Sequence, residues 1–432
     1  MSREPELVDR IGILRPLRIR DFRLLWAGMT VSMIGDGVYT VAVAWQAYEI
    51  WNRPSALAAV GVAWSLPQVV LLLGAGVLSD RLDRRRLMIA GDLVRLVAIG
   101  AIGALSILGS LTLARLVGLV AVYGAGQAVF GPAFSSIVPQ IVPDDLRVQA
   151  NSLAQFVRPL TLALVGPVVG GFLISWLGVG WAFVVDAATF VVSAAAILAM
   201  RTRAVAREEL ERPSAWRDLV EGLRFVRRRT WLWAAMVGGT ISLLFTWGPW
   251  DVLLPYVVKN DLGGSASDLG IVYGAGGLGA VVVALTMGQR GRLPRRPITA
   301  LYLSWALGML LLAGFGLAVR LWQAMVVALV AEGAITLLMV IWTTLLQRLV
   351  PREVLGRVSS LDWLLATAGV PLSFALVGPA ASVLGVDATL IGAGVLGAAV
   401  TLAFLLVPGA REPERDEALR AALVAGAQSS QV

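Results

Sequence analysis

The sequence predicts an all-α integral membrane protein with twelve transmembrane helices in two six-helix bundles. Its 432 residues are 58% hydrophobic and only 15% charged, whereas roughly 25% of the residues of an average soluble domain are charged. A transmembrane helix needs roughly 20 mostly apolar residues. The apolar content therefore supplies about a dozen spans joined by short connections.

Apolar runs bounded by charged residues, Pro or Gly locate the individual spans. A charged stretch from Arg201 to Thr230 divides them into two groups. In the first half we expect spans at 24–50, 56–78, 87–111, 116–137, 149–177 and 179–200. In the second half we expect spans at 231–258, 269–287, 298–319, 321–346, 359–383 and 388–407.

Cationic residues set the expected orientation, because Lys and Arg concentrate in cytoplasmic loops. With the amino terminus inside, the inner loops carry twenty-one cationic residues and the outer loops only four: Arg53, Arg115, Lys259 and Arg320. The sequence thus predicts a cytoplasmic segment 1–23, an N-terminal bundle 24–200, a cytoplasmic linker 201–230, a C-terminal bundle 231–408 and a cytoplasmic tail 409–432. We expect a multi-pass protein of the cell (inner or plasma) membrane, and its net charge of +8 requires no nucleic-acid partner.

The composition excludes several kinds of site. Cys and His are both absent, which excludes disulfides, thiol nucleophiles, zinc clusters and histidine proton relays. No nucleophile, metal or cofactor constellation is present in the sequence, so we expect no cofactor, no metal and no enzymatic activity. Any proton chemistry must use Asp, Glu or water.

Apolar residues in the linker recur at helical spacing, at Trp216, Leu219 and Leu223, with charged residues on the other side. A helix of this kind lies on the inner membrane surface or serves as a solvated connection between the halves. The sequence leaves both alternatives open.

Two matches between the halves indicate an internal duplication. Val142-Pro143 in the first half corresponds to Val350-Pro351 in the second, and the five residues Ala163–Pro167 recur identically as Ala375–Pro379. Both matches fall in the corresponding helix of each half. We therefore expect two pseudo-symmetric bundles.

The loop between the second and third spans carries an ordered motif, Gly76-Val77-Leu78-Ser79-Asp80-Arg81-Leu82-Asp83-Arg84-Arg85-Arg86. A small residue permits close packing at the helix end, and a carboxylate beside guanidiniums pairs with them; an ordinary Arg-rich cytoplasmic loop is the alternative. The order of residues resembles the loop signature G-x-L-a-D-R-x-G-R-[KR] of the major facilitator superfamily, with Asp83 in place of the second Gly. The resemblance implies a cytoplasmic gating motif at Gly76, Asp80, Arg81, Arg84 and Arg85.

The fifth span contains Gly166-Pro167-Val168-Val169-Gly170-Gly171, which resembles the antiporter signature G-x-x-x-G-P-x-x-G-G of the same superfamily. Small residues let a neighbouring helix approach, and Pro removes a backbone hydrogen bond. The resemblance implies that Gly166, Pro167, Gly170 and Gly171 form an antiporter-type motif. The arginine that many members carry in the fourth span is absent, since Val120 and Val122 occupy that spacing, so proton coupling by that route is unsupported.

The charged residues inside the expected spans include Asp36, Asp92, Arg95, Arg158, Asp186, Asp251 and Glu332. A carboxylate at the bilayer centre costs about 2.5–3.5 kcal/mol on insertion scales, so each one requires a cavity, a partner or a proton. The resemblance implies that the first, fourth, seventh and tenth helices line a central cavity. These helices carry Asp36, Gln127, Asp251 and Glu332.

Asp36 and Glu332 lie at mid-span beside glycines, and we expect both to couple protons or contact substrate. Asp251 and Arg158 are also candidates for this cavity, although Asp251 near the outer end equally suits a structural role. A buried guanidinium at Arg158 either holds a neighbouring acid ionised or binds an anionic ligand. We expect Asp92 and Arg95, three residues apart, to form a local ion pair, and Asp186 to make a contact to backbone rather than to couple protons.

The whole stretch 24–407 resembles the superfamily, and Phe22–Trp26 followed by Gly35-Asp36 resembles its branch of proton-coupled multidrug and siderophore exporters. This resemblance implies the major facilitator fold and a monomeric antiporter that exports amphipathic organic compounds or drugs by alternating access. Its partners would be a small-molecule substrate, protons and membrane lipid. The alternatives are a dedicated exporter of one metabolite such as a siderophore, an importer or uniporter of a small polar solute, and a non-transporting scaffold or receptor.

Overall fold

A computed structural model describes residues 12–81, 83–143, 146–201, 215–290 and 292–416. At 12–13, 72–81, 215–219, 352 and scattered positions between 132 and 156 it describes the backbone alone. The chain divides into two compact units. The first unit comprises the described residues up to 201 together with Gly263–Gly274, and the second comprises those from 215 to 262 and from 275 to 416.

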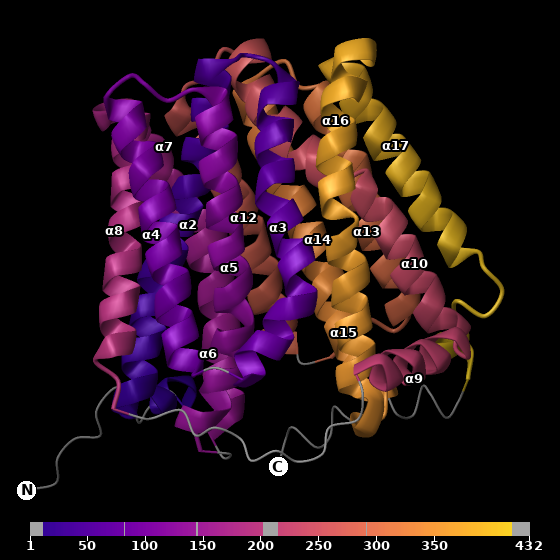
Figure 1. The fold of residues 1–432 in the computed structure, drawn as a ribbon. Helices are drawn as coiled ribbons and strands as arrows, with labels where there is room; N and C mark the ends of the chain where they lie inside the picture. Colours follow the sequence, from indigo (N-terminus) through magenta and orange to yellow (C-terminus); the bar gives the residue numbers. More distant parts are fainter. Residues whose placement is uncertain (1–11, 82, 144–145, 202–214, 291, 417–432) are drawn as a thin grey trace, which may run out of the picture. The chain divides into compact units, whose positions relative to one another are not determined.

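The first unit is built from helices that run along one another (Figure 1). Its long helices pack in the pairs α2 with α8, α4 with α5, α4 with α8, and α3 with α5. Its elements are η1 (Gly12–Arg18), α2 (Arg20–Ile50), α3 (Pro54–Arg81), α4 (Arg84–Ile107), α5 (Leu113–Ile141), α6 (Arg147–Arg158), η3 (Pro159–Val165), α7 (Gly166–Leu177) and α8 (Val179–Leu198).

The second unit repeats this construction, with α13 packed against α14 and α17. A helix, α9 (Ala215–Arg227), lies in the predicted linker. The remaining elements are α10 (Thr230–Leu244), η4 (Pro249–Leu253), α11 (Leu254–Tyr256), η5 (Val257–Asp261), α12 (Ala266–Arg290), α13 (Pro297–Gly316), α14 (Leu321–Leu349), α15 (Arg352–Ala368), α16 (Val370–Leu384), α17 (Val386–Leu405) and α18 (Glu412–Arg415). The first residues of α12 belong to the first unit.

Twelve helical stretches of the described chain are long and apolar enough to span a membrane, which confirms the predicted number. Three of them are composite. The fifth joins η3 to α7, the seventh runs from α10 to η5, and the eleventh joins α15 to α16. The segments η3, η4 and η5 are π-helical, and π-helical turns inside α-helices occur often at functional sites.

The internal duplication is visible in how helices end. Val142 ends α5 and Val350 ends α14, each with an extended backbone and an amide N–H bonded four residues back. Gly178 after α7 and Gly385 after α16 share an unusual backbone, with φ of 90° and 87°, which glycine adopts without steric penalty. The repeated Ala163–Pro167 segment is out of this register by about one helical turn, since Pro167 precedes Gly178 by eleven residues and Pro379 precedes Gly385 by six.

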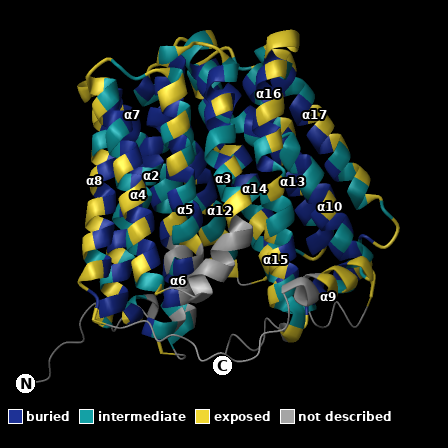
Figure 2. Ribbon diagram, in the orientation of Figure 1, coloured by how far each residue is buried: buried dark blue, intermediate teal, exposed yellow. Residues whose placement is uncertain are grey.

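Buried and exposed residues alternate along the helices of both units (Figure 2), and apolar side chains occur in both classes, as in lipid-embedded proteins. Along α8, Trp181, Val185 and Val192 are exposed. Asp186 and Ser193, on the opposite side of the same helix, are buried. α8 is therefore amphipathic in the inverse sense, with its polar face turned into the unit.

Candidate functional site

Asp36 lies in the middle of α2 with its side chain partly buried. The hydroxyl of Tyr123, on α5, donates a hydrogen bond to Asp36 Oδ1 at 2.8 Å. The ring of Tyr123 packs on the ring of Tyr39, one turn along α2, with 4.6 Å between their centroids. These contacts fix the orientation of the carboxylate, and nothing in the sequence pattern identified Tyr123 as its partner.

Asp186 is fully buried on α8, next to the backbone of α2. A Cβ on Gly35 would collide with Asp186 Oδ1 and Thr189 Oγ1, so the glycine allows both polar atoms to reach the residue before Asp36. Asp36 and Asp186 are close enough for electrostatic repulsion. The contact to backbone that we expected is thus a packing contact, and it brings Asp186 beside the candidate carboxylate.

The expected ion pair between Asp92 and Arg95 is confirmed. The two side chains are 0% and 3% exposed. The Arg95 guanidinium carbon lies 4.4 Å and 4.5 Å from the ring centroids of Phe130 and Phe190, within the range of cation–π attraction. Arg95 also attracts Asp36 and Asp186, so the pair is part of the same site.

We call Asp36, Asp92, Arg95, Tyr123 and Asp186 the first-unit cluster. Four helices contribute to it: α2, α4, α5 and α8. The three carboxylates do not converge as a metal site would, since no group of three acidic side chains among the described residues can hold an ion. The sequence carried one signal for Asp186, because an acid inside an apolar span without a basic residue one turn away needs a partner from another helix.

The second unit holds its own carboxylates. Glu332, on α14, is partly buried, and its Cγ lies 2.9 Å from the position that a Cβ on Gly276 of α12 would occupy. Gly276 therefore leaves the space that the Glu332 side chain fills. A larger residue at 276 would displace the carboxylate.

Asp251 lies in the π-helical segment η4 and is partly buried. It is close enough to Glu332 for electrostatic repulsion. Its neighbour Trp250 meets Phe315 of α13 edge to face, with 5.4 Å between ring centroids. Asp251 and Glu332 therefore interact electrostatically within the second unit.

The other two cavity candidates have different surroundings. Gln127 on α5 accepts a hydrogen bond from Trp64 Nε1 of α3 at 2.9 Å. The burial expected of Arg158 is wrong, because the side chain is exposed at the end of α6. Arg158 still attracts Asp36 electrostatically, and its exposure follows from its position where α6 gives way to the π-helical segment η3.

Only part of the loop motif is described with side chains. Gly76, Asp80 and Arg81 lie where the side chains fall outside the description, so their gating role stays a prediction. Arg84 is the first residue of α4 and is partly buried.

Asp83 supplies the turn that the family's second Gly would supply. It caps α4, since its Oδ1 accepts the backbone N–H groups of Arg85 at 2.8 Å and Arg86 at 3.2 Å. The Arg85 guanidinium donates to the carbonyl oxygen of Leu198, the last residue of α8. A cation is favourable at this helix end, where the carbonyl groups have no partner within the helix.

Gly166 and Gly170 pack α7 against α2. A Cβ on Gly166 would lie 2.7 Å from Gly37 Cα, and a Cβ on Gly170 would lie 2.9 Å from Val38 Cα. Pro167, between them, is buried. These contacts are internal to the first unit.

Gly171 faces a different segment, the start of α12. A Cβ on Gly171 would lie 2.6 Å from the carbonyl oxygen of Ala266 and 3.1 Å from Gly270 Cα. One turn along α7, Ser175 Oγ accepts the amide N–H of Ser267 at 3.2 Å. Different glycines of the antiporter-type motif therefore make two packing contacts, one with α2 and one with the start of α12. A role of the motif in closing the transport pathway stays a prediction.

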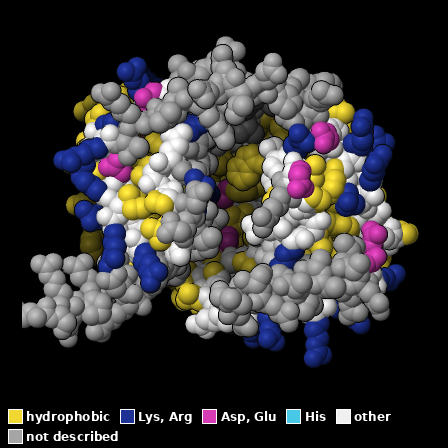
Figure 3. All heavy atoms as spheres, turned by 90° about the horizontal axis from the view of Figure 1, so that it is seen from below, with side chains coloured by type: hydrophobic (Ala, Val, Ile, Leu, Met, Phe, Trp, Pro, Cys, Tyr) yellow, Lys and Arg dark blue, Asp and Glu magenta, His cyan; other side chains and the backbone are white. Residues whose placement is uncertain are grey.

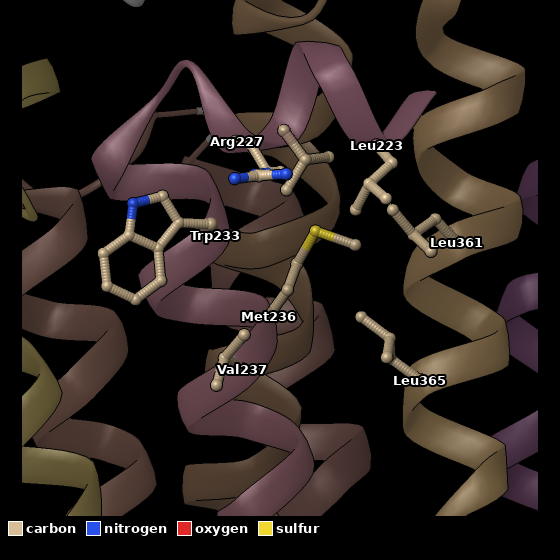
Figure 4. Close-up of a pocket in the computed structure, with 8 residues that line it drawn as sticks. Leu223, Arg227, Trp233, Met236, Val237, Leu361 and Leu365 are labelled. Atoms are coloured by element: carbon tan, nitrogen blue, oxygen red, sulfur yellow. The ribbon is translucent and has the colours of Figure 1, made fainter. Parts of the chain in front are cut away.

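A groove of about 300 Å³ opens between α9, α10 and α15 in the second unit. Figure 4 shows its lining, which is apolar apart from Arg227: Leu223, Val226, Trp233, Met236, Val237, Leu361 and Leu365. Glu221 of α9 forms an ion pair with Arg357 of α15 at 2.7 Å. No carboxylate lines the groove, so it is separate in chemistry from the Asp251 and Glu332 site.

Lys and Arg side chains are exposed on each of the two units (Figure 3). On α9 and just after it, Arg224, Arg227 and Arg228 are exposed. In the first unit Arg20 and Arg23 are exposed at the start of α2, and Arg86 at the start of α4.

Exporters are among the proteins that this chain resembles. Macrolide efflux protein A of Streptococcus pyogenes is 23% identical over 368 residues, which cover 85% of this chain and 90% of that protein. Enterobactin exporter EntS of Shigella boydii is 28% identical over 367 residues, which cover 83% of this chain and 84% of that protein.

A crystal structure of a POT family transporter in complex with 5-aminolevulinic acid has the same fold. It aligns with a TM-score of 0.71 at 12% sequence identity, over 90% of this chain and 96% of that one. The family model described as transmembrane secretion effector, MFS_3, matches residues 11–425. With twelve candidate spans and a match over almost its whole length, this chain belongs to the MFS_3 family of transmembrane secretion effectors, a branch of the major facilitator superfamily of membrane transporters.

Proposed function

We propose that this transporter is a proton-driven exporter of amphipathic organic compounds that works by alternating access of its two units. One observation carries the proposal: each unit holds two carboxylates that interact electrostatically among apolar helices, Asp36 with Asp186 and Asp251 with Glu332. Ionised acids at such positions are costly and are retained where a pathway for ions or protons needs them.

Asp36 and Glu332 are the proposed coupling groups. A proton bound to either one removes a charge from the interior, which makes it easier for helices to close around the site. Asp251 and Gln127 would contribute polar contacts to the cavity, and exposed Arg158 would steer or neutralise anionic groups near Asp36. The residues Gly76, Asp80, Arg81, Arg84 and Arg85 are proposed to control opening on the cytoplasmic side.

The relatives support export of an organic compound, since one is named for macrolides and another for enterobactin. A dedicated exporter of a single siderophore-like product is the second candidate, and the enterobactin exporter favours it. An importer or uniporter of a small polar solute remains the alternative from the same fold.

The test is resistance of cells to a compound panel, with and without the intact protein, measured in the presence and absence of a proton uncoupler. Broad, uncoupler-sensitive resistance supports multidrug export. Accumulation of a single endogenous product inside cells that lack the protein supports dedicated export. Transport that the uncoupler leaves unchanged would contradict proton coupling.

We also propose a monomer in the plasma membrane with both termini in the cytoplasm. The exposed Arg residues of α9 and those at the starts of α2 and α4 support this orientation through the positive-inside rule. Because the chain has no Cys, single cysteines report location without background. A membrane-impermeant maleimide should label Arg53→Cys in intact cells and should leave Arg295→Cys unlabelled; the reverse pattern would invert the topology.

A further inference from the structure

We propose that Asp186 is a second proton-binding carboxylate of the first unit, which holds a proton while Asp36 is ionised. This inference rests on the proposed proton-driven export, to which it adds a place where a proton is stored inside the helices. Asp186 lies outside both sequence motifs, on α8. Three observations lead to it: the charge of the cluster, its geometry, and one unpaired oxygen.

The first-unit cluster contains more acid than base. Three carboxylates, Asp36, Asp92 and Asp186, share one buried guanidinium, that of Arg95. Arg95 is bound to Asp92, so that pair is already neutral. If Asp36 and Asp186 were both ionised, the cluster would carry two uncompensated negative charges among apolar helices, an arrangement that low dielectric strongly disfavours.

Asp186 and Asp36 differ in how far their side chains are exposed. Asp186 is 0% exposed and packs on the backbone at Gly35, whereas the neighbouring Asp36 is only partly buried. Asp36 also receives the hydroxyl hydrogen bond of Tyr123 at 2.8 Å, which a carboxylate accepts readily. The ionised form therefore suits Asp36, and the neutral form suits Asp186.

The second oxygen of Asp186 supports the same assignment. Its Oδ2 is buried and has no hydrogen-bond partner among the described residues. Its Oδ1 lies 3.5 Å from the hydroxyl oxygen of Thr189, whose hydrogen is donated to the Asp186 carbonyl oxygen at 2.6 Å. A buried ionised oxygen left without a donor is more costly than a neutral one.

Several packed elements contribute charged or titratable groups around Asp36 and Asp186. The charged and titratable groups that face the site are Asp36 and Tyr39 on α2, Asp92 and Arg95 on α4, Tyr123 on α5, and exposed Arg158 at the end of α6. Arg95 is the only one of these cations that is buried. Its ion pair with Asp92 keeps it in place whichever of the other two acids holds the proton.

The proton step is an exchange between two carboxylates. The O–H bond of Asp186 breaks as an O–H bond forms on Asp36, the reverse transfer restores the first arrangement, and the pair keeps a charge of minus one during this exchange. With Asp186 protonated, Asp36 takes up a further proton on one side of the membrane and releases it on the other, so the pair alternates between a charge of minus one and neutrality. The buried acid allows the unit to pass between conformations without a double negative charge inside it.

Infrared difference spectroscopy on the purified full-length protein tests the assignment directly. We expect the spectrum of the wild type minus that of Asp186→Asn at neutral pH to contain one C=O band of a protonated carboxylic acid, shifted in D₂O. The matched control is Glu49→Gln, which removes an exposed carboxylate from α2 and should give no such band. Because Asp186→Asn can fail to fold, Asp186→Glu serves as a second variant and should keep a protonated-acid band at a displaced frequency.

The inference and the proposed function fail in different ways. Absence of the band in the difference with folded Asp186→Asn overturns the inference, as does loss of the same band in Glu49→Gln. Uncoupler-insensitive transport by the wild type overturns the proposed function and the storage role with it, whatever the spectrum shows. Proton-driven transport together with the band lost only at Asp186 supports both.

Discussion

The side-chain hydroxyl of Ser373, on α16, bridges a break in the seventh span beside Gly248. Ser373 Oγ accepts the amide N–H of Gly248 at 2.8 Å and donates to the carbonyl oxygen of Leu244 at 2.7 Å. In an unbroken α-helix these two backbone groups, four residues apart, would bond to each other. Gly248 has no Cβ to prevent the approach, since a Cβ would collide with the Ser373 backbone.

Ser373→Ala should therefore destabilise the protein by about 1–3 kcal/mol, because it leaves a buried donor and a buried acceptor unpaired. The matched control is Ser382→Ala on the same helix, where the serine is exposed and bonds only within its own turn. That change should stay within about 0.5 kcal/mol. Denaturation in detergent measures both, and equal destabilisation would contradict the bridging role.

Asp36→Asn and Glu332→Gln should each abolish uphill transport while leaving the protein folded. Both substitutions keep side-chain size and remove the group that would exchange a proton. In proteoliposomes with an imposed pH gradient, we expect accumulation to fall to equilibrium while exchange down a substrate gradient continues. Glu49→Gln is again the control, and unchanged uphill transport in both variants would remove these acids from the mechanism.

Gly170→Ala should destabilise the first unit by about 1–3 kcal/mol, since its new Cβ would lie 2.9 Å from Val38 Cα and both atoms belong to helix backbones. Gly118→Ala is the matched control on α5, where a Cβ meets nothing within 4 Å. There the change should stabilise by about 0.4–1 kcal/mol. Thermal unfolding of the two variants should move in opposite directions, and a shared direction would show that the close contact is not limiting.

Asp83→Ala should cost about 1 kcal/mol through loss of the cap on α4. Asp83→Asn keeps an oxygen for the same two amide groups and should cost little. The comparison separates capping from charge, because Asn removes the charge and retains the acceptor. A large and equal loss of thermal stability in both variants would assign the effect to charge instead.

The number and order of the spans could be predicted from apolar runs, because a helix that spans a lipid bilayer must consist mainly of apolar residues. The ion pair of Asp92 and Arg95 was also predictable, since both residues lie on one helix. The segment Ala163–Pro167 shows the limit of such matching. It recurs as Ala375–Pro379, yet the structure places the two copies about a turn apart relative to the ends of α7 and α16.

The first-unit cluster could not be predicted in the same way. The bond between Asp36 and Tyr123 joins residues 87 positions apart, and their contact depends on how α2 and α5 rotate about their axes. The sequence predicts only a backbone contact for Asp186. α8 has a polar inner face, and Gly35 is what allows the polar atoms of that face to reach α2.

The polar inner face of α8 affects how the newly made chain assembles in the membrane. A helix that exposes Trp181, Val185 and Val192 while burying Asp186 and Ser193 leaves the translocon with a polar stripe that lipid does not accept. α2 is synthesised before α8, and the polar stripe of α8 is covered only when α8 packs against α2 in the bilayer. A Gly35 variant that blocks this docking should therefore appear in cells as rapid degradation of newly made chains, before any transport is measured.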